Sequence, residues 1–297
     1  MNFKEHLDKR VSRIEAVLAK YLPQEGGPAG VVLEAMNYSV NAGGKRLRPM
    51  LMQEAFVLCG GSGELVEPFM AALEMIHTYS LVHDDLPAMD NDEYRRGRKT
   101  THVVYGETMA ILAGDALLNY AFETACRAFA MKPGCAQTER AIGVLAEKAG
   151  IFGMIGGQTA DILAENAEGA ADMPQLLFIH EKKTAALIQA ALMIGAILAG
   201  AEQEVVDLLE KVGYDVGVAF QIQDDILDVT GEMAELGKPI GSDEKNHKTT
   251  YVTLAGVDEA KKEVERLSNE AVSILEAFET RNEFLEELIR ELITRRK

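Results

Sequence analysis

The stretch TAALIQAALMIGAILAGA, residues 184–201, is the longest apolar run in the sequence and decides between two kinds of fold. An apolar helix of this length is long enough to cross a membrane. Gln189 interrupts the run, however, and the run is rich in Ala and Gly, not in Leu and Phe. This composition favours a helix buried inside a soluble helical bundle over a membrane-spanning helix.

The segments on either side of this run also carry helical patterns. Apolar residues recur three and four positions apart, and strand-like alternation is rare. Short breaks rich in Gly or Pro separate the segments, and a longer break at 230–248 has the length of a functional loop. The sequence therefore predicts an all-α fold. We expect one domain over residues 1–297, a bundle of about ten helices around a central apolar cavity.

Composition limits the classes of partner and compartment. The net charge of −17 argues against nucleic-acid binding, which needs a basic face, but a phosphorylated substrate can bind at a locally basic or metal-filled site. Cys59, Cys126 and Cys135 show no metal-ligand spacing, which predicts free thiols in a reducing compartment. The first twenty residues lack the apolar core of a signal peptide. We therefore expect a cytoplasmic protein without a membrane span.

An acidic cluster follows one apolar helix in FQIQDDILDVTG, residues 220–231. Asp224 and Asp228 are four apart, so an ideal helix places them about 40° apart on one face, and Gln221 lies on the same stripe. Crowded carboxylates in a poorly solvated site raise each other's pKa unless a cation relieves them. Mg²⁺ is typically bound by one or two carboxylates together with substrate phosphates. The pattern therefore predicts a divalent-cation site.

A second acidic cluster lies earlier, in HDDLPAMDNDEYRRG, residues 83–97. Asp84 and Asp90 are about 240° apart on an ideal helix and share a face only if the helix breaks, for which Pro87 is well placed. We predict a helix end whose backbone loops out and brings Asp90 back towards Asp84. An EF-hand starting at Asp90 is excluded, because Arg95 stands where that loop needs Gly. One such cluster alone is typical of a solvated surface, but two clusters after apolar helices favour metal binding.

Small basic islands complement the acids. They are GGKRLRP with Lys45, Arg46 and Arg48, EKKTAALI with Lys182, Lys183 and Thr184, and the two lysines Lys238 and Lys248. Each island alone is typical of a surface patch. Arg offers phosphate a bidentate contact and Lys a point charge. Together with the acidic clusters, the islands predict two bound anionic groups, one held through metal and one held directly.

The motifs GGKRLRP, DDLPAMD followed by RRG, GGQTAD, KT, FQIQDDILD and GKPIGSD stand in this order along the chain. Their order and sequence strongly resemble the trans-isoprenyl diphosphate synthases, and among these the bacterial farnesyl diphosphate synthases most closely. The resemblance implies a homodimeric polyprenyl synthase that uses three Mg²⁺ ions, for which Mn²⁺ can substitute. It ionises an allylic diphosphate (dimethylallyl, then geranyl diphosphate), adds isopentenyl diphosphate and releases farnesyl diphosphate.

The resemblance also implies a role for each matching residue. The expected metal ligands are Asp84, Asp90 and Asp224, supported as catalytic carboxylates by Asp85, Asp225 and Asp228. The allylic diphosphate is expected to bind Arg95, Lys183, Thr184, Gln221, Lys238 and Lys248, of which Arg95 and Lys183 also count as catalytic. Isopentenyl diphosphate is expected to bind Lys45, Arg48, His77 and Arg96. For Gln158 and Asp161 of GGQTAD, a polar contact between helices is an equal alternative.

Product length is expected to depend on Tyr79 or Ser80, which precede Asp84 by about one helical turn. On an ideal helix Ser80 is nearly in line with Asp84, whereas Tyr79 lies about 140° away. The resemblance nevertheless favours Tyr79, since an aromatic residue at this place accompanies fifteen-carbon products in similar synthases. The alternatives are that Tyr79 is ordinary core packing, and that the chain makes geranylgeranyl diphosphate or another short-chain product.

Two rival classes fit the sequence less well. A class I terpene cyclase carries a second motif of the NSE or DTE kind in place of DDILD, and has no need of GGKRLRP for a second diphosphate. A non-catalytic subunit of a hetero-oligomeric prenyl synthase usually lacks one or both aspartate clusters, and both are intact here.

Overall fold

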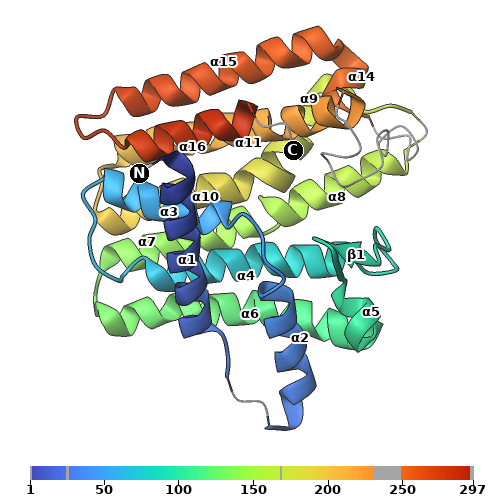
Figure 1. The fold of residues 1–297 in the computed structure, drawn as a ribbon, viewed down its shortest axis with the longest axis vertical. Coiled ribbons are helices and arrows are strands. Elements are labelled where there is room, and N and C mark those ends of the chain that lie inside the picture. Colours follow the sequence, from blue (N-terminus) through green and yellow to red (C-terminus); the bar gives the residue numbers. More distant parts are fainter. Residues whose placement is uncertain (1, 25–26, 168, 231–248, 295–297) are drawn as a thin grey trace. The chain divides into compact units, whose positions relative to one another are not determined.

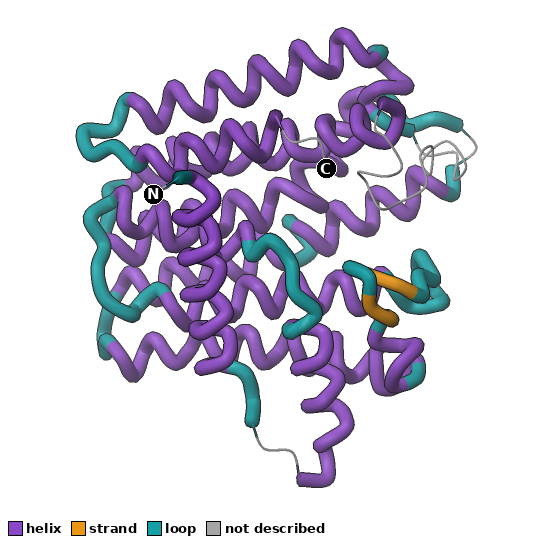
Figure 2. Tube along the Cα trace, viewed as in Figure 1, coloured by secondary structure: helices purple, strands orange, loops and turns teal. Residues whose placement is uncertain are grey.

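The computed structural model describes residues 2–24, 27–167, 169–230 and 249–294 (Figure 1). Within these ranges almost every regular element is a helix, and strand is confined to one short hairpin (Figure 2). The predicted all-α fold is therefore confirmed. The chain divides into two compact units, of which the first contains residues 1–53 and 62–142 and the second 54–61 and 143–297. The single domain and its central cavity stay predictions.

Unit 1 is built mainly on the pairing of two long helices. Its elements are α1 (Phe3–Tyr21), η1 (Gly27–Ala29), α2 (Gly30–Val40), the start of α3 (Leu47–Leu58), α4 (Glu67–Asp84), β1 (Tyr94–Arg95), β2 (Arg98–Lys99), α5 (Thr101–Tyr105), α6 (Glu107–Met131) and the start of α7 (Ala136–Ala149). Asn2 and Glu5 form a capping box that fixes the start of α1. Pro68 stands in the first turn of α4, where its missing N–H costs no hydrogen bond.

Small residues on α6 allow α4 to approach closely. Ala110, Ala113, Gly114 and Ala121 are all buried along one side of α6. A Cβ atom at Gly114 would lie 2.0 Å from Nε2 of His83, one residue before the aspartates of α4. Gly114 is thus required by close packing, and it fixes where the last turn of α4 lies relative to α6.

Unit 2 collects the remaining helices. Its elements are the end of α3, the end of α7, α8 (Met154–Glu165), α9 (Met173–Ile179), the π-helix η2 (His180–Ala185), α10 (Ala186–Ala199), α11 (Gln203–Thr230), α14 (Tyr251–Ala255), α15 (Val257–Glu276) and α16 (Glu283–Thr294). Gly213 and Gly217 of α11 face the backbone of Gln189 and Ala185, where a Cβ would come within 2.6 Å. These glycines let α11 pack directly on α10 and η2.

The apolar run at 184–201 lies in the core of unit 2. Among the described residues, the segment Met173–Ala199 passes the length and composition test for a membrane helix, with a mean hydropathy of 1.4. Yet 78% of its most apolar window is buried inside the structure. Gln189 is also buried and accepts a hydrogen bond from Nζ of Lys148 at 2.9 Å. The segment is a buried core helix, as its composition indicated.

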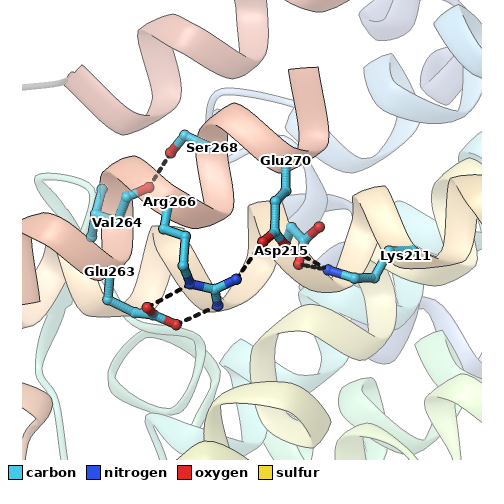
Figure 3. Close-up of polar contacts among 7 residues, drawn as sticks. All are labelled: Lys211, Asp215, Glu263, Val264, Arg266, Ser268 and Glu270. Atoms are coloured by element: carbon cyan, nitrogen blue, oxygen red, sulfur yellow. Dashed lines mark hydrogen bonds and ion pairs between the residues drawn. The ribbon is translucent and has the colours of Figure 1, made fainter. Parts of the chain in front are cut away.

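A charged network joins α11 to α15 in unit 2 (Figure 3). Lys211 donates to Asp215 and to Glu270, while Arg266 bonds Glu263 through two nitrogens and Glu270 through a third. We call these five residues the α11–α15 network. Asp215 is fully buried, and burial raises its pKa against the opposing effect of Lys211. Each cation here has carboxylate partners, so the network joins the two helices.

Several local features go beyond the sequence prediction. The β1–β2 hairpin, the five-residue helices α5 and α14, and the π-helical turn in the apolar segment have no clear signal in the hydrophobic pattern.

All three cysteines lie in described residues and are free thiols, as predicted: Cys135 is buried, Cys59 half-buried and Cys126 exposed.

Candidate active site

The first aspartate segment is a broken helix end. Helix α4 ends at Asp84, and the chain then turns through Leu86 and Pro87. The backbone N–H of Asp90 donates to the carbonyl oxygen of Asp84 at 2.9 Å. The predicted loop that brings Asp90 back to Asp84 is therefore confirmed, and its physical cause is that Pro87 cannot continue the helical hydrogen bonding.

Asp85 lies in a different environment from its neighbours. It is buried, and Oδ1 accepts from both Nε and Nη2 of Arg95 at 2.7 and 2.6 Å. Burial raises the pKa of Asp85, while the Arg95 guanidinium counteracts that rise. Asp84 is half-buried and Asp90 exposed. Asp84 and Asp90, two of the three acids predicted to bind metal, thus reach solvent, and Asp85 holds the predicted phosphate ligand Arg95.

Arg96 occupies the tip of the hairpin that follows. Arg96 and Gly97 have φ angles of 53° and 75°, so the two-residue turn has the left-handed conformation that suits tight hairpins. Nη1 of Arg96 donates to the carbonyl oxygen of Gly43. A Cβ at Gly44 would lie 2.6 Å from the same guanidinium. The second glycine before KRLRP, Gly44, therefore makes room for an arginine about fifty residues further along the chain.

The basic island at 45–48 divides into two kinds of residue. The side chain of Arg46 is fully buried and pairs with Glu15 and Glu74, each at 2.7 Å. Its membership of an anion-binding island is therefore wrong, because both carboxylates already neutralise it. Lys45 is exposed, and Arg48 is half-buried. Nε of Arg48 is buried and has no hydrogen-bond partner.

Arg48, His77 and Arg96 form what we call the basic cluster. Burial lowers the pKa of Arg48 to about 10, and the charge of Arg96 adds to that effect against the opposing pull of Glu74. Burial, and then the charges of Arg48 and Arg96, hold the pKa of His77 well below its usual range. Positive charges that disfavour one another, beside a buried guanidinium N–H without a partner, are suited to binding an anion.

The structure separates the two candidates for product length. Tyr79 is 6% exposed, and its ring meets His83 edge to face with centroids 5.8 Å apart. Since His83 lies over Gly114, Tyr79 is on the side of α4 that faces α6. Its buried hydroxyl has no hydrogen-bond partner, and burial raises its pKa to about 12. Ser80 instead donates to the carbonyl oxygen of His77.

The second aspartate segment lies on the continuous helix α11 of unit 2. Asp224 and Asp228 are half-buried, one turn apart, as the spacing predicts. Asp225 is buried; its Oδ2 accepts the backbone N–H of Tyr251 at 2.8 Å and lies 3.9 Å from Nε2 of His180. Asp225 thus anchors the start of α14, and its catalytic role stays a prediction.

Lys183 and Thr184 lie in the π-helical turn η2. Such turns insert one residue into a helix and are frequent at functional sites. Nζ of Lys183 pairs with Oδ2 of Asp161 at 2.5 Å, and Oγ1 of Thr184 donates to Oε1 of Gln221 at 3.0 Å. A Cβ at Gly157 would lie 2.1 Å from the backbone nitrogen of Lys183. This close approach explains why the second residue of GGQTAD is a glycine.

These contacts bring the expected allylic-diphosphate ligands of unit 2 together. Thr184 and Gln221 touch directly, and Lys183 is adjacent to Thr184. Asp161 takes the helix-contact role that was left open for it, as the partner of Lys183. Lys182 turns to Glu181 at 2.6 Å. The expected ligands Lys238 and Lys248 lie outside the described residues.

The carboxylates fit a cation that arrives with phosphate. Among the described residues, no three His, Cys, Asp or Glu side chains are close enough together to hold a metal by themselves. Each unit instead offers two solvent-accessible acids, Asp84 with Asp90 and Asp224 with Asp228. Mg²⁺ retains water and is commonly held by one or two carboxylates plus substrate phosphates, so pairs of this kind suit it.

Two residues of the site region carry no signal in the aspartate or basic motifs. Tyr38 on α2 and Arg98 on β2 contact each other and the hairpin that bears Arg96. The separation of sixty residues between them hides the contact from any local pattern. Only the RRG that precedes Arg98, a turn signal, indicates that a hairpin lies there.

Comparison with known proteins gives one consistent family. Residues 30–292 match the polyprenyl synthetase family. The geranylgeranyl diphosphate synthase of Cyanophora paradoxa is 44% identical over 91% of this chain and 89% of its own. The farnesyl diphosphate synthase of Geobacillus stearothermophilus is 40% identical over 89% of this chain and 88% of its own. The structure of a Helicobacter pylori geranyltransferase complexed with magnesium and isoprenyl diphosphate aligns with a TM-score of 0.82, 33% identity, and coverage of 99% and 97%.

Proposed function

Because the chain belongs to the polyprenyl synthetase family, a family of prenyltransferases, we propose that it condenses isopentenyl diphosphate with dimethylallyl and geranyl diphosphate and releases farnesyl diphosphate as its main product. One observation above all supports this function. The basic cluster contains a buried, unpartnered Nε of Arg48 beside a histidine whose pKa is lowered by burial and by neighbouring arginines. A metal-independent anion site next to an aspartate pair suits a two-diphosphate reaction.

In the proposed reaction the protein orients two substrates and stabilises charge. Asp84, Asp90 and Asp224 would hold Mg²⁺, which neutralises the departing diphosphate when it is bound. Lys183 and Thr184 would exchange their partners Asp161 and Gln221 for phosphate oxygens. The carbon–oxygen bond of the allylic diphosphate breaks, and the double bond of isopentenyl diphosphate attacks the resulting cation.

The remaining step is loss of a proton, for which the released diphosphate is the base. No covalent enzyme intermediate is needed, so catalysis rests on orientation and on fixed charges. Arg48, Arg96 and neutral His77 would hold isopentenyl diphosphate so that its double bond faces the allylic carbon. A neutral His77 donates one hydrogen bond to the diphosphate without adding a third positive charge to the cluster.

The direct test is product analysis. The purified chain is incubated with isopentenyl and dimethylallyl diphosphates and Mg²⁺, and the products are resolved by chain length with mass spectrometry. We expect farnesyl diphosphate, no product with a chelator present, and recovery with Mg²⁺ or Mn²⁺. A cyclic hydrocarbon made from one diphosphate would identify a cyclase instead, and an inactive chain would favour the non-catalytic subunit. A homodimer and a cytoplasmic location stay predictions; light scattering of the purified protein tests the first.

Product length is assigned to Tyr79, which lies on the α6 side of α4 and carries a bulky ring against His83. We expect Tyr79→Ala to give geranylgeranyl or longer products, because removal of the ring leaves space for a longer tail. Ser80→Ala, the adjacent control, should leave product length unchanged. The alternative, a geranylgeranyl diphosphate synthase, is favoured if the unmodified chain already makes twenty-carbon product, or if an active Tyr79→Ala variant shows no change.

A further inference from the structure

The β1–β2 hairpin that carries Arg96 depends on other parts of unit 1 for its position. Each strand has two residues, Tyr94–Arg95 and Arg98–Lys99, and they pair as Tyr94 with Lys99 and Arg95 with Arg98. A two-stranded hairpin of this size is at best marginally stable alone. Arg96 at its tip also has the positive φ that non-glycine residues disfavour. External contacts must therefore hold the tip in place.

Those contacts come from the C-terminal end of α2. The hydroxyl of Tyr38 donates to the carbonyl oxygen of Lys99 at 2.7 Å. The guanidinium of Arg98 lies 4.4 Å from the centroid of the Tyr38 ring, within the range of a cation–π contact. Nη1 of Arg98 further donates to the carbonyl oxygen of Asn41 at 3.2 Å. The hydroxyl contact and the cation–π contact of Tyr38 are both made to β2, the strand directly after the Arg96 turn.

The ring of Tyr38 is itself fixed. It meets the ring of Tyr105 on α5 edge to face, with centroids 5.6 Å apart. The neighbouring Ser39 shares a buried 2.8 Å hydrogen bond with Thr101 at the start of α5. The end of α2 is therefore a rigid platform, and β2 lies against it.

The two arginines of the hairpin differ in how they are held. Arg95 makes two short bonds to the buried Asp85, so its position follows α4. Arg96 bonds the backbone oxygen of Gly43 and rests over Gly44. Loss of the β2 contacts would thus displace Arg96 while Asp85 keeps Arg95 in place.

We propose that Tyr38 and Arg98 form a clamp that positions Arg96 for isopentenyl diphosphate and has little effect on the allylic substrate. They are positioning residues, since neither is required to touch a substrate. This inference rests on the proposed function, which assigns the diphosphate of isopentenyl diphosphate to the basic cluster. The clamp joins α2, which carries none of the aspartate or basic motifs, to the selectivity of the reaction for one of its two substrates.

The decisive variant is Tyr38→Phe, which removes one hydroxyl, changes no charge and keeps the ring under Arg98. We expect the KM for isopentenyl diphosphate to rise about two- to tenfold, the range for loss of one hydrogen bond. The KM for the allylic substrate and kcat should stay unchanged. Arg98→Gln should show the same selective rise, and Arg98→Lys, which keeps a cation over the ring, should restore much of it.

Tyr120→Phe is the matched control. The hydroxyl of Tyr120 accepts a hydrogen bond from Arg127, but Tyr120 lies on α6 and not beside the hairpin. Thermal unfolding of each variant checks that the fold is retained. If the unmodified chain is active, three results would contradict the clamp. They are equal changes in both KM values, no change in either KM of Tyr38→Phe, and the same selective change in Tyr120→Phe. If the unmodified chain transfers no prenyl group, the proposed function fails first and the clamp with it.

Discussion

The basic cluster of unit 1 and the α11–α15 network of unit 2 are both dense in charge, yet their cations are paired with carboxylates to different degrees. In the network, Arg266 and Lys211 each bond two carboxylates (Figure 3). Asp215 accepts from Lys211 through Oδ1, while its buried Oδ2 has no hydrogen-bond partner. In the basic cluster, Arg48 has an unpartnered Nε, and burial, assisted by the charge of Arg96, lowers the pKa values of Arg48 and His77. A network whose cations are all paired with carboxylates stabilises a helix pair, whereas cations with an unpartnered buried N–H suit an anionic ligand.

This difference gives a rule for substitutions. Removal of a charge that awaits a ligand should reduce activity and leave the free energy of unfolding almost unchanged. Removal of a charge from the α11–α15 network should reduce the free energy of unfolding and leave activity unchanged.

The largest effect is expected at the aspartate pairs, which follow the first half of the rule. Asp84→Ala and Asp224→Ala should each abolish turnover, since both acids are partly exposed and are proposed to bind Mg²⁺. Stability should change little, because loss of one acid relieves repulsion within its pair. Steady-state kinetics and urea unfolding measure the two quantities. Retention of more than about a tenth of the activity by either variant, a barrier change below about 1.4 kcal/mol, would argue against metal binding there.

Arg96→Lys and Arg95→Lys should separate the two substrates. Lysine cannot reproduce a bidentate phosphate contact, so we expect Arg96→Lys to raise the KM for isopentenyl diphosphate about tenfold and Arg95→Lys to act mainly on the allylic substrate. Arg95→Lys should also lower stability, because Arg95 pairs with the buried Asp85. Equal effects on both KM values in both variants would contradict the assignment, and equal stabilities would blur the distinction between paired and unpaired cations.

Lys211→Met tests the second half of the rule. The substitution leaves the buried Asp215 without its cation, so the free energy of unfolding should fall by about 1 kcal/mol, a modest value because Lys211 is partly exposed. Kinetic constants should not change. Lys262→Met is the control, since Lys262 pairs with an exposed acid on the same helix. A loss of activity in Lys211→Met at retained stability would show that the network also serves the reaction.

The smallest effect is a pH dependence at Asp215. Burial raises its pKa, so the folded chain binds this proton more readily than the unfolded chain does. As the pH falls through the folded pKa towards the ordinary value of about 3.9, the unmodified chain should therefore gain stability relative to Asp215→Asn. Urea unfolding of both proteins between pH 7 and pH 4 measures the difference. A trend of opposite sign would mean that the attraction of Lys211 outweighs the cost of burial.

Much of the site follows from local sequence. The i, i+4 spacing of Asp224 and Asp228 fixes a shared helix face, and Pro87 forces the break that returns Asp90 to Asp84. Both results need only helix geometry and the missing N–H of proline. The apolar run at 184–201 likewise determines a buried helix, because its composition leaves few polar groups to solvate.

Tertiary structure decided what each charge meets. Arg46 and Arg48 stand two apart in one motif, yet Glu15 and Glu74 neutralise Arg46 while Nε of Arg48 stays unpartnered. Asp225 lies between two solvent-accessible acids but accepts the first backbone N–H of α14, and Tyr79 meets His83 over Gly114 on α6. Glu15, Glu74, Tyr251 and Gly114 are all distant along the chain from the residues that they meet. Periodicity reports which face of a helix a residue occupies, but only packing decides which group lies opposite, and that group sets the pKa, the pairing and the role.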